Sequence, residues 1–200
     1  PEVFVLEVMG RDAGWLAASC CITGDVDLLV LPEVAFDRDA FLAEVRAKFE
    51  ATGSCYIVVS EGARYADGTY LSAGDTAHDG FAHAVLGGAA QTVKQMIVDT
   101  GIVPRGVVQD LSRAARSSNF AQSLVDVTEA YDLGMSAHMR SADPAFTGQV
   151  VGIRRNPEAA AEGRYEAELF AGPASEFANF VKRFPAEWIL PNYQGITPEA

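Results

Sequence analysis

The chain has 200 residues, of which 49% are hydrophobic and 21% are charged. This composition suits a globular chain that buries a core, and it excludes a disordered tail, a collagen-like repeat and a disulfide-rich miniprotein. The formal net charge is −12 at pH 7, from 27 acidic and 15 basic residues. That charge argues against nucleic acid and against an anionic membrane as the main partner, whereas a small anionic ligand responds only to nearby charges.

The three cysteines, Cys20, Cys21 and Cys55, indicate the compartment. They cannot all pair with one another, and an odd number of thiols fits a reducing environment. Their spacing matches no zinc motif, no apolar run is long enough to span a bilayer, and no signal peptide is recognisable. We therefore expect a cytoplasmic protein. Because Pro1 stands directly before a strand-like run, we also expect that upstream sequence is missing.

Apolar runs alternate with helical periodicity along the chain. The runs that predict strands are Val3–Val8, Leu28–Leu31, Cys55–Ser60, Val103–Val108 and Gln149–Ile153. Strands that alternate with helices form βαβ units, in which parallel strands carry helices on both faces. The sequence therefore predicts an α/β fold, a three-layer αβα sandwich around a mostly parallel, Rossmann-like sheet.

Helices are predicted from capping residues and from the spacing of apolar residues. Asp37 is expected to cap the start of one helix and Gly53 to end it, while Asp126 and Glu129 form an acidic capping box. Residues 155–200 are expected to be a tail that packs back on the domain. The predicted helices are residues 15–18, Phe36–Thr52, Leu86–Thr100, Asp126–Arg140 and Phe177–Phe180.

The loop after the first predicted strand, Met9–Gly14, is a candidate anion site. Ligands of parallel sheets bind beyond the carboxyl ends of the strands. A glycine turn that leads into a helix presents free backbone N–H groups there, and Arg11 adds a bidentate donor. A phosphate or carboxylate is the natural partner of this arrangement. The alternative is a tight turn with a solvated arginine.

Two further loops follow predicted strands at the same edge of the sheet. Glu61 follows the third strand, where a carboxylate can accept hydrogen bonds from sugar hydroxyls, and Arg64 and Tyr65 are candidate rim residues. Arg113 follows the fourth strand and adds a second cation. Each of these residues can equally be a solvated loop residue. Arg11, Glu61 and Arg113 together suit a phosphorylated polyol, because arginines bind phosphate and a glutamate binds a hydroxyl.

Several of these segments resemble motifs of the 6-phosphofructokinase family. Glu7–Ala17 resembles the segment E-V-M-G-R-x-A-G-W-L-A, whose M-G-R contacts fructose 6-phosphate. Val58–Ala63 resembles V-V-S-E-G-A, whose glutamate binds the sugar. Phe81–Gly88 is similar to the F-G-H-x-x-L-G-G segment of the pyrophosphate-dependent branch, to which the chain is therefore closer than to the ATP-dependent branch. The likeness extends over nearly the whole chain.

The resemblance implies that residues 1–200 are the C-terminal, sugar-phosphate-binding half of such an enzyme. The family's donor-binding half carries a Gly-Gly-Asp motif and a Thr-x-Asp motif, which supplies the catalytic base. Both lie upstream of the M-G-R segment and therefore outside this chain. The implied reaction transfers a phosphoryl group from pyrophosphate to the 1-hydroxyl of fructose 6-phosphate and yields fructose 1,6-bisphosphate, in glycolysis or gluconeogenesis. The chain alone is expected to be inactive.

The resemblance also implies the cofactor, the assembly and the site residues. Mg²⁺ is expected to neutralise the donor through ligands in the absent half, with none in this chain. An arginine from a neighbouring subunit implies a homodimer or homotetramer. No catalytic base is expected here, and Arg11 is expected to position the substrate and stabilise the transition state. The expected substrate-binding residues are Met9, Gly10, Arg11, Glu61 and Arg113, with Asp110 and Arg105 as further candidates.

Two alternatives stay open at this point. The donor can be ATP, because the residues that select the donor lie in the absent half. The chain can also belong to a non-catalytic sugar-phosphate-binding or regulatory subunit. The absence of the donor-binding half is the larger departure from the family. A smaller one is in the phosphate loop, Gln109–Arg113, which is one residue closer to Arg105 than the family's L-G-x-x-Q-R and has Ser112 in place of the glutamine.

Overall fold

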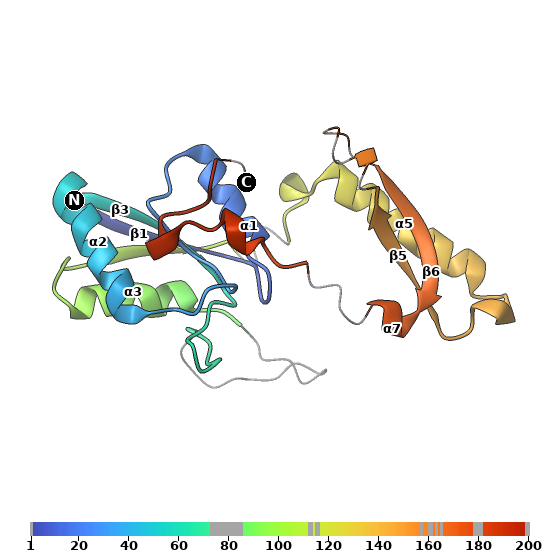
Figure 1. The fold of residues 1–200 in the computed structure, drawn as a ribbon, viewed down its shortest axis with the longest axis horizontal. Helices are drawn as coiled ribbons and strands as arrows, with labels where there is room; N and C mark the ends of the chain where they lie inside the picture. Colours follow the sequence, from blue (N-terminus) through green and yellow to red (C-terminus); the bar gives the residue numbers. More distant parts are fainter. Residues whose placement is uncertain are drawn as a thin grey trace. The chain divides into compact units, whose positions relative to one another are not determined.

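The computed structural model divides the chain into two units (Figure 1). The first unit comprises Pro1–Ser117 together with Val181–Ala200, and the second comprises Ser118–Phe180. The residues that the structure describes are 2–72, 86–111, 114, 117–156, 158, 159, 162, 164, 166–177 and 182–198.

The first unit is built around a sheet of parallel strands. The strands are β1 (Glu2–Val8), β2 (Leu28–Val30), β3 (Ser54–Ser60) and β4 (Gly106–Asp110), and their order across the sheet is β2-β3-β1-β4. β1 therefore lies between β3 and β4, with Val8 opposite Ser60 and Glu7 opposite Asp110. Helices cover both faces of the sheet, which confirms the predicted Rossmann-like αβα sandwich.

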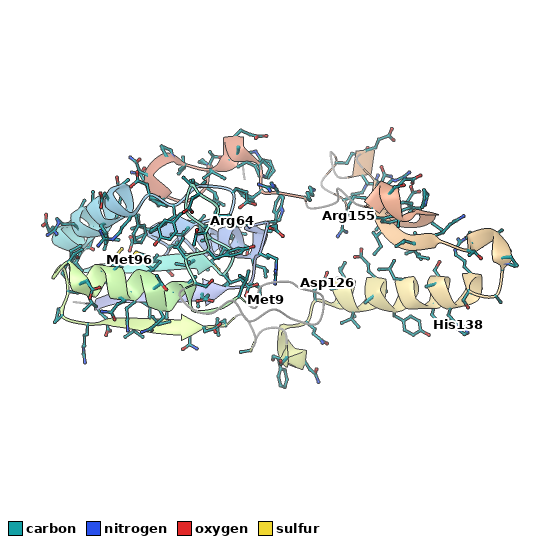
Figure 2. All side chains as sticks on the ribbon, turned by 90° about the horizontal axis from the view of Figure 1, so that it is seen from below. Met9, Arg64, Met96, Asp126, His138 and Arg155 are labelled. Carbon is teal, nitrogen blue, oxygen red and sulfur yellow. The ribbon has the colours of Figure 1, made fainter. Side chains whose placement is uncertain are left out.

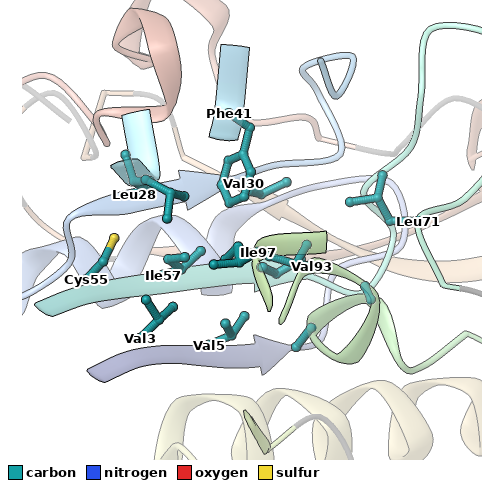
Figure 3. Close-up of a cluster of buried hydrophobic side chains, with 14 of the residues drawn as sticks. Val3, Val5, Leu28, Val30, Phe41, Cys55, Ile57, Leu71, Val93 and Ile97 are labelled. Carbon is teal, nitrogen blue, oxygen red and sulfur yellow. The ribbon is translucent and has the colours of Figure 1, made fainter. Parts of the chain in front are cut away.

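One face of this sheet packs against α2 (Arg38–Thr52) and α3 (Ala89–Asp99). Successive side chains of a strand point to opposite faces, so alternate residues of β1, β2 and β3 enter this core. Burial of these apolar side chains is the main stabilising contribution to the unit. Figure 3 labels the core residues Val3, Val5, Leu28, Val30, Phe41, Cys55, Ile57, Leu71, Val93 and Ile97.

The other face of the sheet is covered by α1 (Trp15–Ser19) and by residues 182–198. Leu29 and Val58 face this side and are buried together with Ala17 and Phe184. The rings of Trp15 and Phe184 meet edge-on with centroids 4.8 Å apart. The C-terminal residues therefore complete the second core of the first unit. The 3₁₀ turns on this side are η1 (Cys20–Thr23) and η4 (Ala186–Trp188), whereas η5 (Pro191–Tyr193) contacts α2 and Tyr193 packs against the first core.

The predicted ends of α2 are confirmed. The Asp37 carboxylate accepts hydrogen bonds from the backbone N–H groups of Asp39 and Ala40, both at 3.0 Å. These bonds satisfy two of the donors that a helix start leaves without a partner. Gly53 ends the helix with φ of 78°, a conformation that is unfavourable for residues with a Cβ atom.

Other predicted boundaries were wrong. The helix predicted from Leu86 begins at Ala89, after Gly88 in the left-handed conformation. β4 begins at Gly106 and ends at Asp110, because Pro104 has no N–H group to donate to the ladder. The long helix α5 (Leu124–Arg140) begins before Asp126, since the Ser123 hydroxyl caps it by accepting the N–H of Asp126 at 3.5 Å. Asp126 therefore lies in the first turn and does not form the predicted capping box with Glu129.

The second unit pairs α5 with a β-hairpin that the sequence reasoning did not predict. β5 (Gln149–Arg155) and β6 (Ala167–Pro173) are antiparallel, and the short helix α7 (Ala174–Phe177) follows. The predicted helix Phe177–Phe180 lies mostly outside the described residues. The unit also includes the turns η2 (Asn119–Ala121) and η3 (Pro144–Phe146).

Candidate functional site

The order of the strands places the loops after β1 and β3 side by side at the carboxyl edge of the sheet. β1 leads into α1, which packs on one face of the sheet, whereas the chain after β3 reaches α3 on the opposite face. Ligands of parallel sheets bind beyond the carboxyl ends of adjacent strands whose connections diverge in this way. Met9–Gly14 follows β1 and Glu61–Arg64 follows β3, so both segments lie at this edge.

Short backbone contacts hold these two loops together. The N–H of Glu61 donates to the Val8 carbonyl at 3.0 Å, and the N–H of Gly62 donates to the Gly10 carbonyl at 3.1 Å. The Ser60 hydroxyl donates to the same Gly10 carbonyl at 2.7 Å. A Cβ atom at position 62 would overlap the carbonyl group of Arg11, so the close approach requires glycine there.

Arg64 also bridges the two loops. Its Nη2 atom donates to the Arg11 carbonyl at 2.8 Å and to Oδ1 of Asp12 at 2.9 Å. Figure 2 shows the side chains of Met9 and Arg64 at the end of the first unit where the strands of the sheet finish. Tyr65 was predicted as a rim residue, but it packs on the core, where its ring lies 5.7 Å from that of Phe36.

The structure brings several predicted site residues to this edge. Met9, Gly10, Arg11 and Glu61 are half-buried there, and Oε1 of Glu61 lies 3.5 Å from the Gly10 nitrogen. A hydrogen bond of this length is weak, so the Glu61 carboxylate retains acceptor capacity for a ligand. Asp110 ends β4 at the same edge.

Two other predicted residues are not placed at this edge. Arg105 directly precedes β4 and therefore lies at the amino ends of the strands, opposite the loops that carry Met9 and Glu61. Arg113 falls outside the described residues, as do Ser112 and the Phe81–Val85 part of the motif around His83.

Glu7 is a buried acid beneath the site. It is 1% exposed, and its two carboxylate oxygens accept the N–H groups of Gly88 at 3.0 Å and Ala90 at 2.8 Å. Burial raises the pKa of Glu7, the two N–H donors lower it in part, and the carboxylates of Asp110 and Glu61 raise it further. Glu7 thus ties the start of α3 to β1, two residues before Met9. In the sequence, this supporting role is indicated by an acidic residue at a position of an otherwise apolar strand whose side chain faces the core.

The start of α1 does not offer the predicted anion site. The N–H of Gly14 donates to Oε1 of Glu33 at 2.9 Å, and the N–H of Phe184 donates to the same oxygen at 2.7 Å. A carboxylate of the protein therefore takes the position that we expected for a ligand anion. The positive charge of Arg11 is then the feature of this loop that suits a phosphate.

The cysteines and the acidic residues indicate no nucleophile or metal centre in the parts of the chain that the structure describes. Burial and the nearby Asp27 raise the pKa of Cys55 to about 12, and burial raises the pKa of Cys21 to about 11, so both thiols stay protonated at neutral pH. No group of three or more His, Cys, Asp or Glu side chains among residues 2–72, 86–111 and the later described ranges can hold a metal ion. No described helix is long and apolar enough to cross a membrane.

The fold and the paired loops define a Rossmann-like α/β protein whose loops after β1 and β3 meet at the carboxyl edge of the sheet. The family model described as Phosphofructokinase matches residues 1–138, and the chain belongs to this family. This finding confirms the resemblance inferred from the motifs.

Two relatives that match nearly the whole chain are named for the pyrophosphate-dependent reaction. The chain is 39% identical to a pyrophosphate–fructose 6-phosphate 1-phosphotransferase of Halomonas elongata, over 99% of this chain and 47% of that protein. It is 38% identical to the protein of the same name from Methylococcus capsulatus, over 98% of this chain and 46% of that protein. The chain thus spans about half the length of these relatives.

A solved structure supports the fold. The crystal structure of a pyrophosphate-dependent phosphofructokinase from Marinobacter aquaeolei superposes with a TM-score of 0.70 and 27% sequence identity. The match covers 99% of this chain and 45% of that one.

Proposed function

We propose that this chain forms the fructose 6-phosphate-binding half of an enzyme that transfers a phosphoryl group from pyrophosphate to the 1-hydroxyl of the sugar. The observation that carries the proposal is the adjacency of Met9–Arg11 and Glu61 at the carboxyl ends of β1 and β3. It is supported by relatives of this chain that are named for this donor and this acceptor.

Phosphoryl transfer depends chiefly on positioning and on stabilising negative charge. In the proposed site, Met9 and Gly10 contact the sugar, Arg11 neutralises charge on the reacting side, and Glu61 accepts a sugar hydroxyl. Arg113 binds the 6-phosphate. These residues bind and orient the acceptor, while the base that removes the proton of the 1-hydroxyl comes from outside this chain.

We propose the cofactor and the assembly on the same family basis. Mg²⁺ would accompany pyrophosphate, with ligands mainly from the donor-binding half. The protein would act in the cytoplasm as a homodimer or homotetramer.

The first test measures which donor supports turnover. The full-length protein that carries this chain is expected to convert fructose 6-phosphate with pyrophosphate and Mg²⁺ in a coupled assay, whereas the 200-residue chain alone is expected to show no turnover. Turnover with ATP and none with pyrophosphate would refute the proposed donor. Sugar-phosphate binding without turnover by either donor would indicate the non-catalytic subunit instead.

The second test removes the proposed sugar contact of Arg11. Arg11→Ala is expected to weaken the binding of fructose 6-phosphate about tenfold to a hundredfold, which corresponds to roughly 1.5–3 kcal/mol for a lost charged hydrogen bond. The measurement is a calorimetric titration of the full-length protein. Arg38→Ala is the matched control, because Arg38 is an exposed arginine at the start of α2. Equal affinity of Arg11→Ala and the control would contradict the proposed role.

A further inference from the structure

Arg64 has contacts that a solvated loop arginine does not have. Its guanidinium donates to the Arg11 carbonyl at 2.8 Å, to Oδ1 of Asp12 at 2.9 Å and, through Nε, to the Gly62 carbonyl at 3.3 Å. The planar guanidinium presents its donors in a fixed geometry, so one side chain holds groups of both loops at set distances.

Arg64 is itself held firmly, which lets it act as a support. Its backbone carbonyl accepts the N–H of Phe36 at 2.8 Å, and its guanidinium lies over the Tyr70 ring at 4.9 Å. The side chain is 27% exposed. A cation over an aromatic face gains further attraction when it is partly removed from water. Arg64 therefore fixes the loop after β1 at a set distance from the segment after β3.

The group that Arg64 holds in this loop is the carbonyl of Arg11, whose side chain is the proposed sugar contact. Holding a residue's carbonyl restricts the rotation of its backbone and therefore the direction of its side chain. Asp12, the residue after Arg11, pairs with the same Nη2 atom of Arg64. This ion pair is partly shielded from solvent, because the Asp12 side chain is 38% exposed. A loop that is ordered before binding loses less conformational entropy when the ligand arrives.

We infer that Arg64 is a positioning residue for the acceptor sugar, that it acts through Arg11, and that Asp12 is its partner. The inference rests on the proposed function, and it requires no contact between Arg64 and the sugar. It assigns a role to a side chain that the sequence reasoning placed only at the rim of the site.

The test compares the affinity of variants for fructose 6-phosphate in the full-length protein. Arg64→Ala is expected to weaken binding about tenfold, because a charge-assisted hydrogen bond to the Arg11 loop is lost. Arg64→Lys keeps the charge but not the fork of donors, so its affinity is expected to lie between those of Arg64→Ala and the wild type. Asp12→Ala is expected to weaken binding less than Arg64→Ala does. In the double variant Arg64→Ala/Asp12→Ala, the loss of binding free energy is expected to be smaller than the sum of the losses in the two single variants, because the two side chains are coupled.

Thermal unfolding separates positioning from a purely structural role. If Arg64 served stability alone, Arg64→Ala would lower the unfolding temperature while the folded protein bound the sugar with wild-type affinity. Such a result, or affinities of Arg64→Ala and the control Arg38→Ala within twofold of each other, would overturn the inference. If Arg64→Ala does not fold, the affinities of Arg64→Lys and Asp12→Ala for fructose 6-phosphate are compared with that of Arg38→Ala instead. Affinities within twofold of this control would again overturn the inference.

Hydrogen exchange distinguishes a failure of this inference from a failure of the proposed function. Without ligand, amides in Met9–Gly14 are expected to exchange faster in Arg64→Ala than in the wild type. If amide exchange is faster in Arg64→Ala but even the wild type does not bind fructose 6-phosphate, the proposed function is wrong. The sugar-positioning role of Arg64, which rests on that function, is then wrong as well. If the wild type binds, Arg11→Ala weakens binding and Arg64→Ala does not, the inference alone is wrong.

Discussion

Gly62→Ala is expected to lower the affinity for fructose 6-phosphate about tenfold to a hundredfold, because it displaces the loop that carries Arg11 and a lost charged hydrogen bond costs about 1.5–3 kcal/mol. A methyl group at this position would overlap the carbonyl of Arg11 and approach that of Gly10. Both obstacles are backbone atoms, which cannot rotate away as a flexible side chain can. The loop after β1 must therefore move, and the hydrogen bond from Gly62 to Gly10 is strained or lost.

The same substitution is expected to destabilise the fold by about 1–3 kcal/mol, as overpacking commonly does. Denaturant unfolding and calorimetric titration measure the two effects on one preparation. Gly134→Ala is the matched control, because Gly134 lies in α5 and an added Cβ atom meets nothing within 4 Å. The Gly134→Ala control is expected to gain about 0.5–1 kcal/mol of folding stability and to bind fructose 6-phosphate with wild-type affinity. Wild-type affinity in Gly62→Ala would show that the two loops need not touch.

Glu7→Ala is expected to cost about 2–5 kcal/mol of folding stability, because it leaves the buried N–H of Ala90 and the half-buried N–H of Gly88 without their acceptor. The control is Glu2→Ala, which removes an exposed glutamate from the same strand and is expected to change stability by less than about 0.5 kcal/mol. Chemical denaturation of the three proteins gives the comparison. Similar stabilities for Glu7→Ala and Glu2→Ala would refute a supporting role for Glu7.

Glu7 also predicts a pH dependence with a definite sign. Burial raises the pKa of Glu7 in the folded state, so the folded protein binds this proton more tightly than the unfolded chain does. The stability of the wild type relative to Glu7→Gln is therefore expected to increase as the pH falls from about 7 toward the ordinary glutamate range near about 4.3. A difference that is constant or decreases over this range would contradict the cause assigned to the shift.

Much of the first unit follows from local sequence signals. The apolar run Cys55–Ser60 predicts a strand covered on both faces, and Asp37 and Gly53 mark the two ends of α2. These features depend on residues near one another in the chain. The carboxyl edge of the sheet could also be predicted as the place of the site, because strand topology determines where Met9 and Glu61 meet.

The contacts that support the site could not be predicted in this way. The bond from Arg64 to the Arg11 carbonyl and the bond from Phe184 to Glu33 join residues far apart in sequence and leave no periodic pattern. The hairpin of β5 and β6 was missed because half of it was assigned to a tail. The start of α1 was misjudged for a related reason, since the carboxylate that binds Gly14 comes from a different loop.

The packing of residues 182–198 has a consequence for synthesis of the protein on the ribosome. The sheet face that carries Leu29 and Val58 receives Phe184 as part of its cover, and Phe184 also bonds to Glu33, 151 positions earlier. A nascent chain therefore exposes this apolar face until Phe184 has been synthesised and has left the ribosome. Contacts of such long sequence separation form late and slowly. The first unit thus completes its second core only after the whole of the second unit, Ser118–Phe180, has been translated.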